Sequence, residues 1–158
     1  MKKGLLKTIL LAGFLVGSLD ILAAMANFYI QTGKDPIIVL RYIARAVFGK
    51  EAAYDEAKSL MPVWGLLFHF IIAFCWTTLF FLLYLRLKLM SVNRVLTGIV
   101  YGVFIWAMMT RVVVPLTSLD PSPIVWKQAF IAIGILILAI GMPLSFIAYR
   151  YYNGLKSA

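Results

Sequence analysis

VWGLLFHFIIAFCWTTLFFLLYL, residues 63–85, is a run of apolar and aromatic residues without a single charged side chain. About 20 such residues are enough to cross the hydrocarbon core of a bilayer as an α-helix. Because a charge at the bilayer centre costs about 2.5–3.5 kcal/mol on insertion scales, charge-free runs mark membrane spans. This run therefore predicts a transmembrane helix.

Three more runs of similar length are nearly free of charge. They cover residues 8–30, 95–115 and 125–149. Their charged residues are Asp20, Arg111 and Lys127. The chain of 158 residues is 63% hydrophobic and 13% charged, a composition far from that of soluble domains. We predict an all-α polytopic membrane protein, a four-transmembrane-helix bundle in which residues 1–158 form a single membrane domain.

The first run follows the basic segment MKKGLLK, a pattern shared with secretory signal peptides. The run is longer than the apolar core of a typical signal peptide. Asp20 also lies before the small residues Ala23 and Ala24, within the helix that would have to be cleaved. We favour a retained first span, with cleavage as the alternative.

Basic residues predict the orientation. The two terminal segments and the segment between the second and third spans are basic without an acidic residue, and they contain Lys2, Lys3, Lys7, Arg86, Lys88, Arg94, Arg150 and Lys156. The acidic residues outside the spans lie in the other two segments and are Asp35, Glu51, Asp55, Glu56 and Asp120. Since cytoplasmic loops are rich in Lys and Arg, we expect both termini in the cytoplasm. The net charge of +9 then indicates topology and contact with anionic lipid headgroups, with no nucleic-acid partner.

The segment between the first two spans predicts a short helix over residues 36–48. Asp35 and Pro36 match an N-cap followed by proline in the first turn, and Gly49 matches a C-terminal stop. One face of this helix carries the apolar residues Ile37, Leu40, Ala44 and Val47. Such an amphipathic helix is expected to lie in the outer membrane interface.

Arg41 and Arg45 lie one turn apart on this helix. They are candidate outer-interface contacts. In one interpretation the helix merely covers the bundle, and in the other the two arginines face a substrate.

Small residues let transmembrane helices approach closely, so spaced glycines predict contact faces. The candidate packing positions are Gly13, Gly17, Gly98, Gly102, Gly134 and Gly141. Pro143 is expected to kink the fourth span. Tyrosine and tryptophan rings near span ends are expected to anchor the membrane interfaces, and these are Trp64, Trp126, Tyr84, Tyr149, Tyr151 and Tyr152.

Asp20, His69 and Arg111 are the candidate intramembrane polar site. Counting 1.5 Å per residue from the outer ends places them roughly 15, 10 and 6 Å deep, respectively. A carboxylate at such depth needs compensation, so we expect Asp20 to pair with Arg111 or His69. Alternatively, Arg111 faces elsewhere, because it projects from the side of its helix opposite Gly102. The cluster predicts either a polar site open to the outer side or a structural clamp.

Counting residue types excludes several chemistries. One histidine cannot supply two imidazoles to a haem, and one cysteine cannot form an intrachain disulfide. The chain has no zinc-ligand spacing, nucleophile elbow, phosphate loop or dinucleotide fingerprint. We expect no enzymatic activity, no cofactor and no metal.

The segments AGFLVGSLDILAA (12–24), GLLFHFIIAF (65–74) and GIVYGVFIWAMMTRVVVPLTS (98–118) cover most of the first three predicted spans. Together they resemble a group of uncharacterised small four-pass bacterial inner-membrane proteins. The resemblance implies a bacterial inner membrane and four helices, and it implies no activity.

Two functions remain open at this point. The first is a non-enzymatic accessory or scaffold component that binds lipids or a membrane-protein partner. The second is a small transporter or permease, as a homo-oligomer, that uses the region of Asp20, His69 and Arg111.

Overall fold

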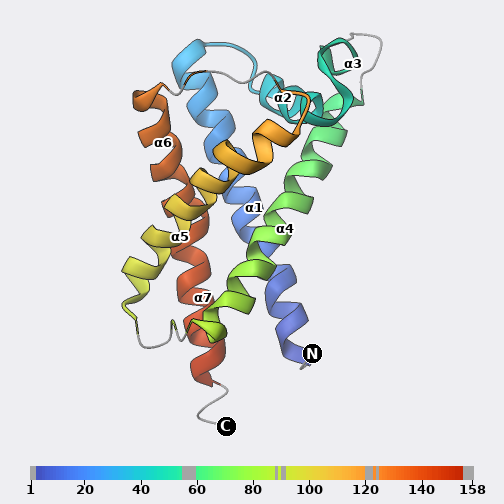
Figure 1. The fold of residues 1–158 in the computed structure, drawn as a ribbon. Coiled ribbons are helices and arrows are strands. Elements are labelled where there is room, and N and C mark those ends of the chain that lie inside the picture. The colour runs from blue at the N-terminus through green and yellow to red at the C-terminus, as the bar shows by residue number, and fades with distance from the viewer. Residues whose placement is uncertain are drawn as a thin grey trace.

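The structure, a computed structural model, describes residues 3–54, 60–87, 89, 92–119, 123 and 125–154. Within these ranges every regular element is helical (Figure 1). In chain order they are α1 (Lys3–Thr32), α2 (Ile37–Phe48), α3 (Lys50–Tyr54), α4 (Met61–Arg86), α5 (Arg94–Met108), the π-helical turn η2 (Met109–Val113), the 3₁₀ turn η3 (Val114–Leu116), α6 (Trp126–Leu136), the π-helical turn η4 (Ile137–Gly141) and α7 (Met142–Gly154). The predicted all-α fold is confirmed.

Four continuous helical segments of the described chain are long and apolar enough to cross a membrane. They are Gly4–Thr32, Met61–Arg86, Arg94–Leu116 and Trp126–Gly154. Each overlaps its predicted run along almost its whole length. The two termini lie at one end of the bundle, and α2 and α3 lie at the other (Figure 1). We call these the terminal end and the α2 end.

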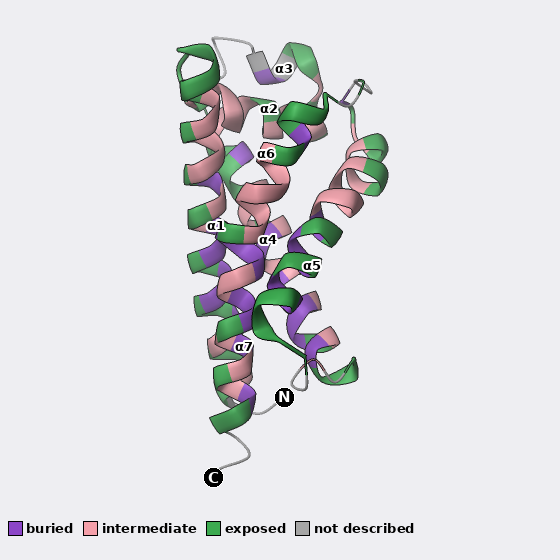
Figure 2. Cartoon of the chain, turned by 90° about the vertical axis from the view of Figure 1, so that its left-hand side faces the viewer, coloured by how far each residue is buried: buried purple, intermediate pink, exposed green. Residues whose placement is uncertain are grey.

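The outward surface of the spans is apolar, as a lipid-facing surface must be. Leu11, Phe14 and Leu138 are all more than 60% exposed. Buried positions gather instead along the lines where the helices meet (Figure 2). A water-soluble bundle would not expose so many large apolar side chains, so the surface supports a membrane protein.

The short helix α2 begins and ends as its flanking residues predict. The side-chain oxygen Oδ1 of Asp35 accepts a hydrogen bond from the Ile37 amide at 2.9 Å. Gly49 stops the helix with φ of 81°, and its amide donates to the carbonyl of Arg45 at 3.0 Å. A positive φ is favourable for glycine because it has no Cβ.

Helix α2 does not lie loosely on the bundle, because it packs against α4 at Gly65. A Cβ on Gly65 would collide with the backbone carbonyl of Leu40, so only glycine permits this approach. Of the predicted apolar face, Ala44 is fully buried whereas Ile37 and Val47 stay exposed. The helix therefore covers the α2 end in fixed contact with α4.

Five of the six predicted packing glycines lie in close helix contacts. Gly13 and Gly17 receive the rings of Phe74 and Phe70 from α4. A Cβ on Gly98 would lie 3.0 Å from the carbonyl carbon and oxygen of Gly141, where α5 crosses η4. A Cβ on Gly102 would lie 2.7 Å from the Cα of Ile137 at the same crossing. Backbone thus meets backbone between the third and fourth spans.

Gly134 departs from the prediction. A Cβ at this position would meet no atom within 4 Å, so Gly134 marks no helix contact in the described chain. Gly134 is one full α-helical heptad from Gly141, but η4 lies between them and is π-helical. Its wider turns change the angular step per residue, so the two glycines do not share a face.

The kink expected at Pro143 corresponds to this same π-helical turn. Proline has no N–H and clashes with the carbonyl four residues earlier, and the turn η4 directly before α7 relieves that conflict. Pro115 follows η2 in the same way. Each of the two π-helical turns thus directly precedes a proline-containing segment that cannot continue a regular α-helix.

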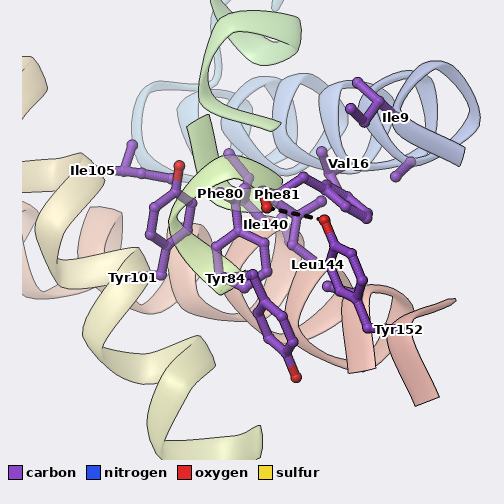
Figure 3. Close-up of a cluster of buried hydrophobic side chains, with 13 residues drawn as sticks. Ile9, Val16, Phe80, Phe81, Tyr84, Tyr101, Ile105, Ile140, Leu144 and Tyr152 are labelled. Carbon is purple, nitrogen blue, oxygen red and sulfur yellow. Dashed lines mark hydrogen bonds between the residues drawn. The ribbon is translucent and has the colours of Figure 1, made fainter. Parts of the chain in front are cut away.

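The core at the terminal end is aromatic (Figure 3). Tyr84 is fully buried and stacks on Tyr152, with ring centroids 5.5 Å apart. The Tyr152 hydroxyl donates to the carbonyl of Phe81 at 3.1 Å, and the Tyr101 hydroxyl donates to the carbonyl of Trp76 at 2.6 Å. The prediction that Tyr84 and Tyr152 anchor the interface is therefore wrong, because both rings join helices inside the bundle.

Candidate functional site

A cavity of about 220 Å³ lies in the α2 half of the bundle. Its walls come from all four spans, and its side at the α2 end is closed by Tyr42, Ile43 and Ala46 of α2. The segment after η3 holds this cover in place, because the amide of Ser118 donates to the carbonyl of Ala46 at 3.1 Å. The cavity is therefore bounded by packed elements on several sides and is partly open.

Most of the cavity wall is apolar. Ile72, Trp76, Ile105 and Ile140 are typical of it. The ionisable side chains among its described walls include one carboxyl, that of Asp20 from α1, and one imidazole, that of His69 from α4. The structure thus brings Asp20 and His69 to one site.

His69 has a defined orientation. Its Nε2 lies 2.8 Å from the carbonyl oxygen of Gly17. Because a carbonyl oxygen can only accept, Nε2 must carry the hydrogen and donate it. The Phe70 ring packs edge-to-face against the imidazole at 5.6 Å. In the neutral ring, Nδ1 is then left as an acceptor.

The bond from His69 also explains why the two helices meet here. The bare backbone of Gly17 lets α4 approach α1, since a Cβ at this glycine would lie 3.1 Å from the Cβ of Ala73. Asp20 is three residues further along α1, on nearly the same face. The glycine pair predicted from spacing therefore positions the polar pair.

Asp20 also lines a second space. An open groove of about 550 Å³ runs between α1 and α6 on the α2 side of Asp20. Asn27, Gln31 and Gln128 add amide groups to its walls. The Gln31 amide nitrogen Nε2 donates to Oδ1 of Asn27 at 2.8 Å. Asp20 thus lines both the apolar cavity and a groove whose walls also carry amide groups.

Arg111 does not join Asp20 and His69. Its side chain is exposed and is not among the walls of the cavity, which on this segment are Met109 and Val113. Arg111 is two residues from both Met109 and Val113 in the turn η2, so its side chain points away from the side that these two residues present to the cavity. The expected three-residue cluster is therefore a pair, and Arg111 takes the outward alternative.

Arg41 and Arg45 of α2 do not line the cavity. Arg41 donates from its guanidinium to the carbonyl of Ala53 in α3 at 3.1 Å. Arg45 is half-buried on the same helix. The acidic residues Asp55, Glu56 and Asp120 of the neighbouring segments lie outside the described residues.

The cavity walls contributed by α2 and by Trp76 were not among the sequence-predicted site residues. No spacing pattern marks Tyr42, Ile43 or Ala46, because their partners come from distant spans. The signal that existed was Gly65, whose missing Cβ permits α2 to lie across α4.

No group of three or more His, Cys, Asp or Glu residues able to hold a metal is found in the part of the chain that the structure describes. The chain matches no protein-family model, no curated protein and no solved structure.

Proposed function

We propose that this protein is a non-enzymatic small transporter or permease that binds a small amphipathic molecule between Asp20 and His69. One observation carries the proposal: Asp20 lines both the apolar cavity and the neighbouring groove. A ligand held at this carboxyl would have a polar route along Asn27 and Gln31 on one side. On the other side it would have an apolar chamber.

The walls of the cavity favour a cationic ligand with an apolar body. No Arg or Lys is among the described cavity walls, so an anion would lack a counter-charge. A buried carboxylate is costly unless it is paired, and a ligand ammonium would supply the pair. The volume of about 220 Å³ lies below the range for drug-sized ligands. A small aromatic or aliphatic amine fits these requirements.

We place the protein in a bacterial inner membrane with both termini in the cytoplasm. The distribution of Lys and Arg supports this orientation. The α2 end, the groove and the cover over the cavity would then face the outer side. The ligand would enter from outside the cell.

An accessory or scaffold function remains the second candidate. The hydrogen bond from His69 to Gly17 favours it, because this bond clamps α1 to α4 with or without a ligand. In that case the polar pair specifies helix register and the cavity has no occupant.

Three probe molecules of similar shape but different charge distinguish the two functions. Phenethylamine, phenethyl alcohol and phenylacetate differ in charge but little in shape. Binding to protein in neutral detergent can be followed by the emission of Trp76, which lines the cavity, in a background where Trp64, Trp106 and Trp126 are phenylalanine. We expect saturable binding of the amine, weaker binding of the alcohol and none of the acid.

Asp20→Asn tests the carboxyl, and Asp35→Asn is the matched control at a capping position where Asn is equally suitable. A charge-assisted hydrogen bond contributes about 1.5–3 kcal/mol, so Asp20→Asn should weaken amine binding at least about tenfold. Uptake of the permanently charged analogue phenethyltrimethylammonium into proteoliposomes, which depends on the carboxylate charge and not on an N–H donor, should also fall in Asp20→Asn. Absence of saturable binding by all three probes, or tightest binding of phenylacetate, would refute the transporter proposal. Loss of stability in Asp20→Asn without any binding signal would indicate the scaffold.

A further inference from the structure

A shallow groove of about 720 Å³ lies at the terminal end, between the start of α5 and the last turns of α7. It lies at the end of the bundle opposite the α2 cover, and the proposed function does not use it. Two arginines, Arg94 of α5 and Arg150 of α7, line this groove together with Phe146, Tyr149 and Asn153. No Asp or Glu is among its described walls. The groove is therefore strongly cationic.

The guanidinium of Arg94 is held in a fixed place. Its Cζ lies 4.2 Å from the ring centroid of Tyr149 and 5.5 Å from that of Phe146. Stacking on ring faces uses the flat surface of the guanidinium and leaves its in-plane N–H donors available. The backbone of Arg94 is fixed as well, because the buried Ser145 hydroxyl donates to its carbonyl at 2.7 Å.

We propose that this groove binds the phosphate of an anionic phospholipid headgroup. Guanidinium groups match phosphate oxygens in charge and in bidentate geometry, and two of them line the groove. Arg94 begins the span Arg94–Leu116 and Arg150 lies near the end of the span Trp126–Gly154, so both are close to headgroup level. Phe146, which is 44% exposed, offers an apolar surface for an acyl chain. That surface favours a lipid over free phosphate.

The experiment compares binding of phosphatidylglycerol and phosphatidylcholine to protein purified in neutral detergent, by native mass spectrometry. We expect a phosphatidylglycerol adduct that persists where phosphatidylcholine is lost. Arg94→Gln and Arg150→Gln should each weaken it about tenfold, the effect of removing one charge-assisted hydrogen bond. Arg111→Gln, the same change at an exposed arginine near the α2 end, is the control and should leave binding unchanged.

If Arg94→Gln fails to fold, Arg150→Gln still tests whether the groove binds the lipid, because the Arg150 side chain is exposed. Equal retention of the two lipids, or an equal loss in Arg111→Gln, would overturn the proposal. Displacement of the lipid by millimolar inorganic phosphate would also overturn it, in favour of a free-anion site.

Discussion

The crossing of α5 and η4 predicts that two Gly→Ala substitutions on the same span change the free energy of unfolding by very different amounts. In Gly141→Ala the new Cβ would collide with the carbonyl oxygen of Gly98 and would lie 3.2 Å from the amide nitrogen of Gly102. These are backbone atoms, which cannot rotate away as a flexible side chain can, so the third and fourth spans must separate. Overpacking of this kind costs about 1–3 kcal/mol, and the backbone clash puts the expected loss at about 3 kcal/mol.

Gly134→Ala is the matched control on the same span. Its new Cβ would meet no atom within 4 Å. Replacing a helical glycine with alanine then stabilises the helix by about 0.5–1 kcal/mol. The two variants should therefore differ by about 4 kcal/mol, or nearly a thousandfold in the unfolding equilibrium constant.

Reversible unfolding in mixed micelles, with sodium dodecyl sulfate as denaturant and circular dichroism as the signal, measures both variants. The expected midpoints lie below wild type for Gly141→Ala and at or above it for Gly134→Ala. If the two alanines shift the midpoint equally, the proposed backbone crossing is wrong.

Two other substitutions test the remaining contacts. In Gly65→Ala the new Cβ collides with the carbonyl of Leu40, so α2 should move away from α4. Amide hydrogen exchange should become faster in α2 and stay unchanged in α7. Equal changes in the exchange rates of both helices would contradict this packing. Ser145→Ala leaves the carbonyl of Arg94 without its donor inside the bundle, and we expect a loss of about 1 kcal/mol by the same micelle titration. Ser18→Ala is the control, with an expected change below about 0.5 kcal/mol, and equal effects of the two serine variants would show that the bond from Ser145 contributes nothing.

The spans could be predicted because the free energy of transferring a helix into lipid is nearly the sum of the contributions of its residues. A run such as residues 63–85 carries its whole signal locally, and α4 covers it as Met61–Arg86. The ends of α2 were also predictable, since the cap by Asp35 and the stop at Gly49 depend on neighbouring residues. Burial of Tyr84 was not predictable, because its stacking partner Tyr152 is distant in the sequence.

The polar pair and the glycines show where helical periodicity fails. Counting residues along the helix places Asp20 and His69 at the right depth and on the right face, because α1 and α4 are regular α-helices throughout the relevant turns. The third and fourth spans contain π-helical turns, which break the 100° step. This explains why Gly134 leaves the face of Gly141. A lone glycine such as Gly65 gives no periodic signal at all.

The position of the cavity follows from where the close contacts lie. Bare backbones meet at Gly98, Gly102 and η4, and the aromatic core lies on the terminal side of this crossing. Helix α5 runs obliquely across the other helices (Figure 1), so a span pinned near its start diverges from them toward the α2 end. Space must open there, and α2 covers it through the contact at Gly65. The close glycine contacts thus set where the third span leaves the other helices, and Asp20 lies beyond these contacts, on the α2 side.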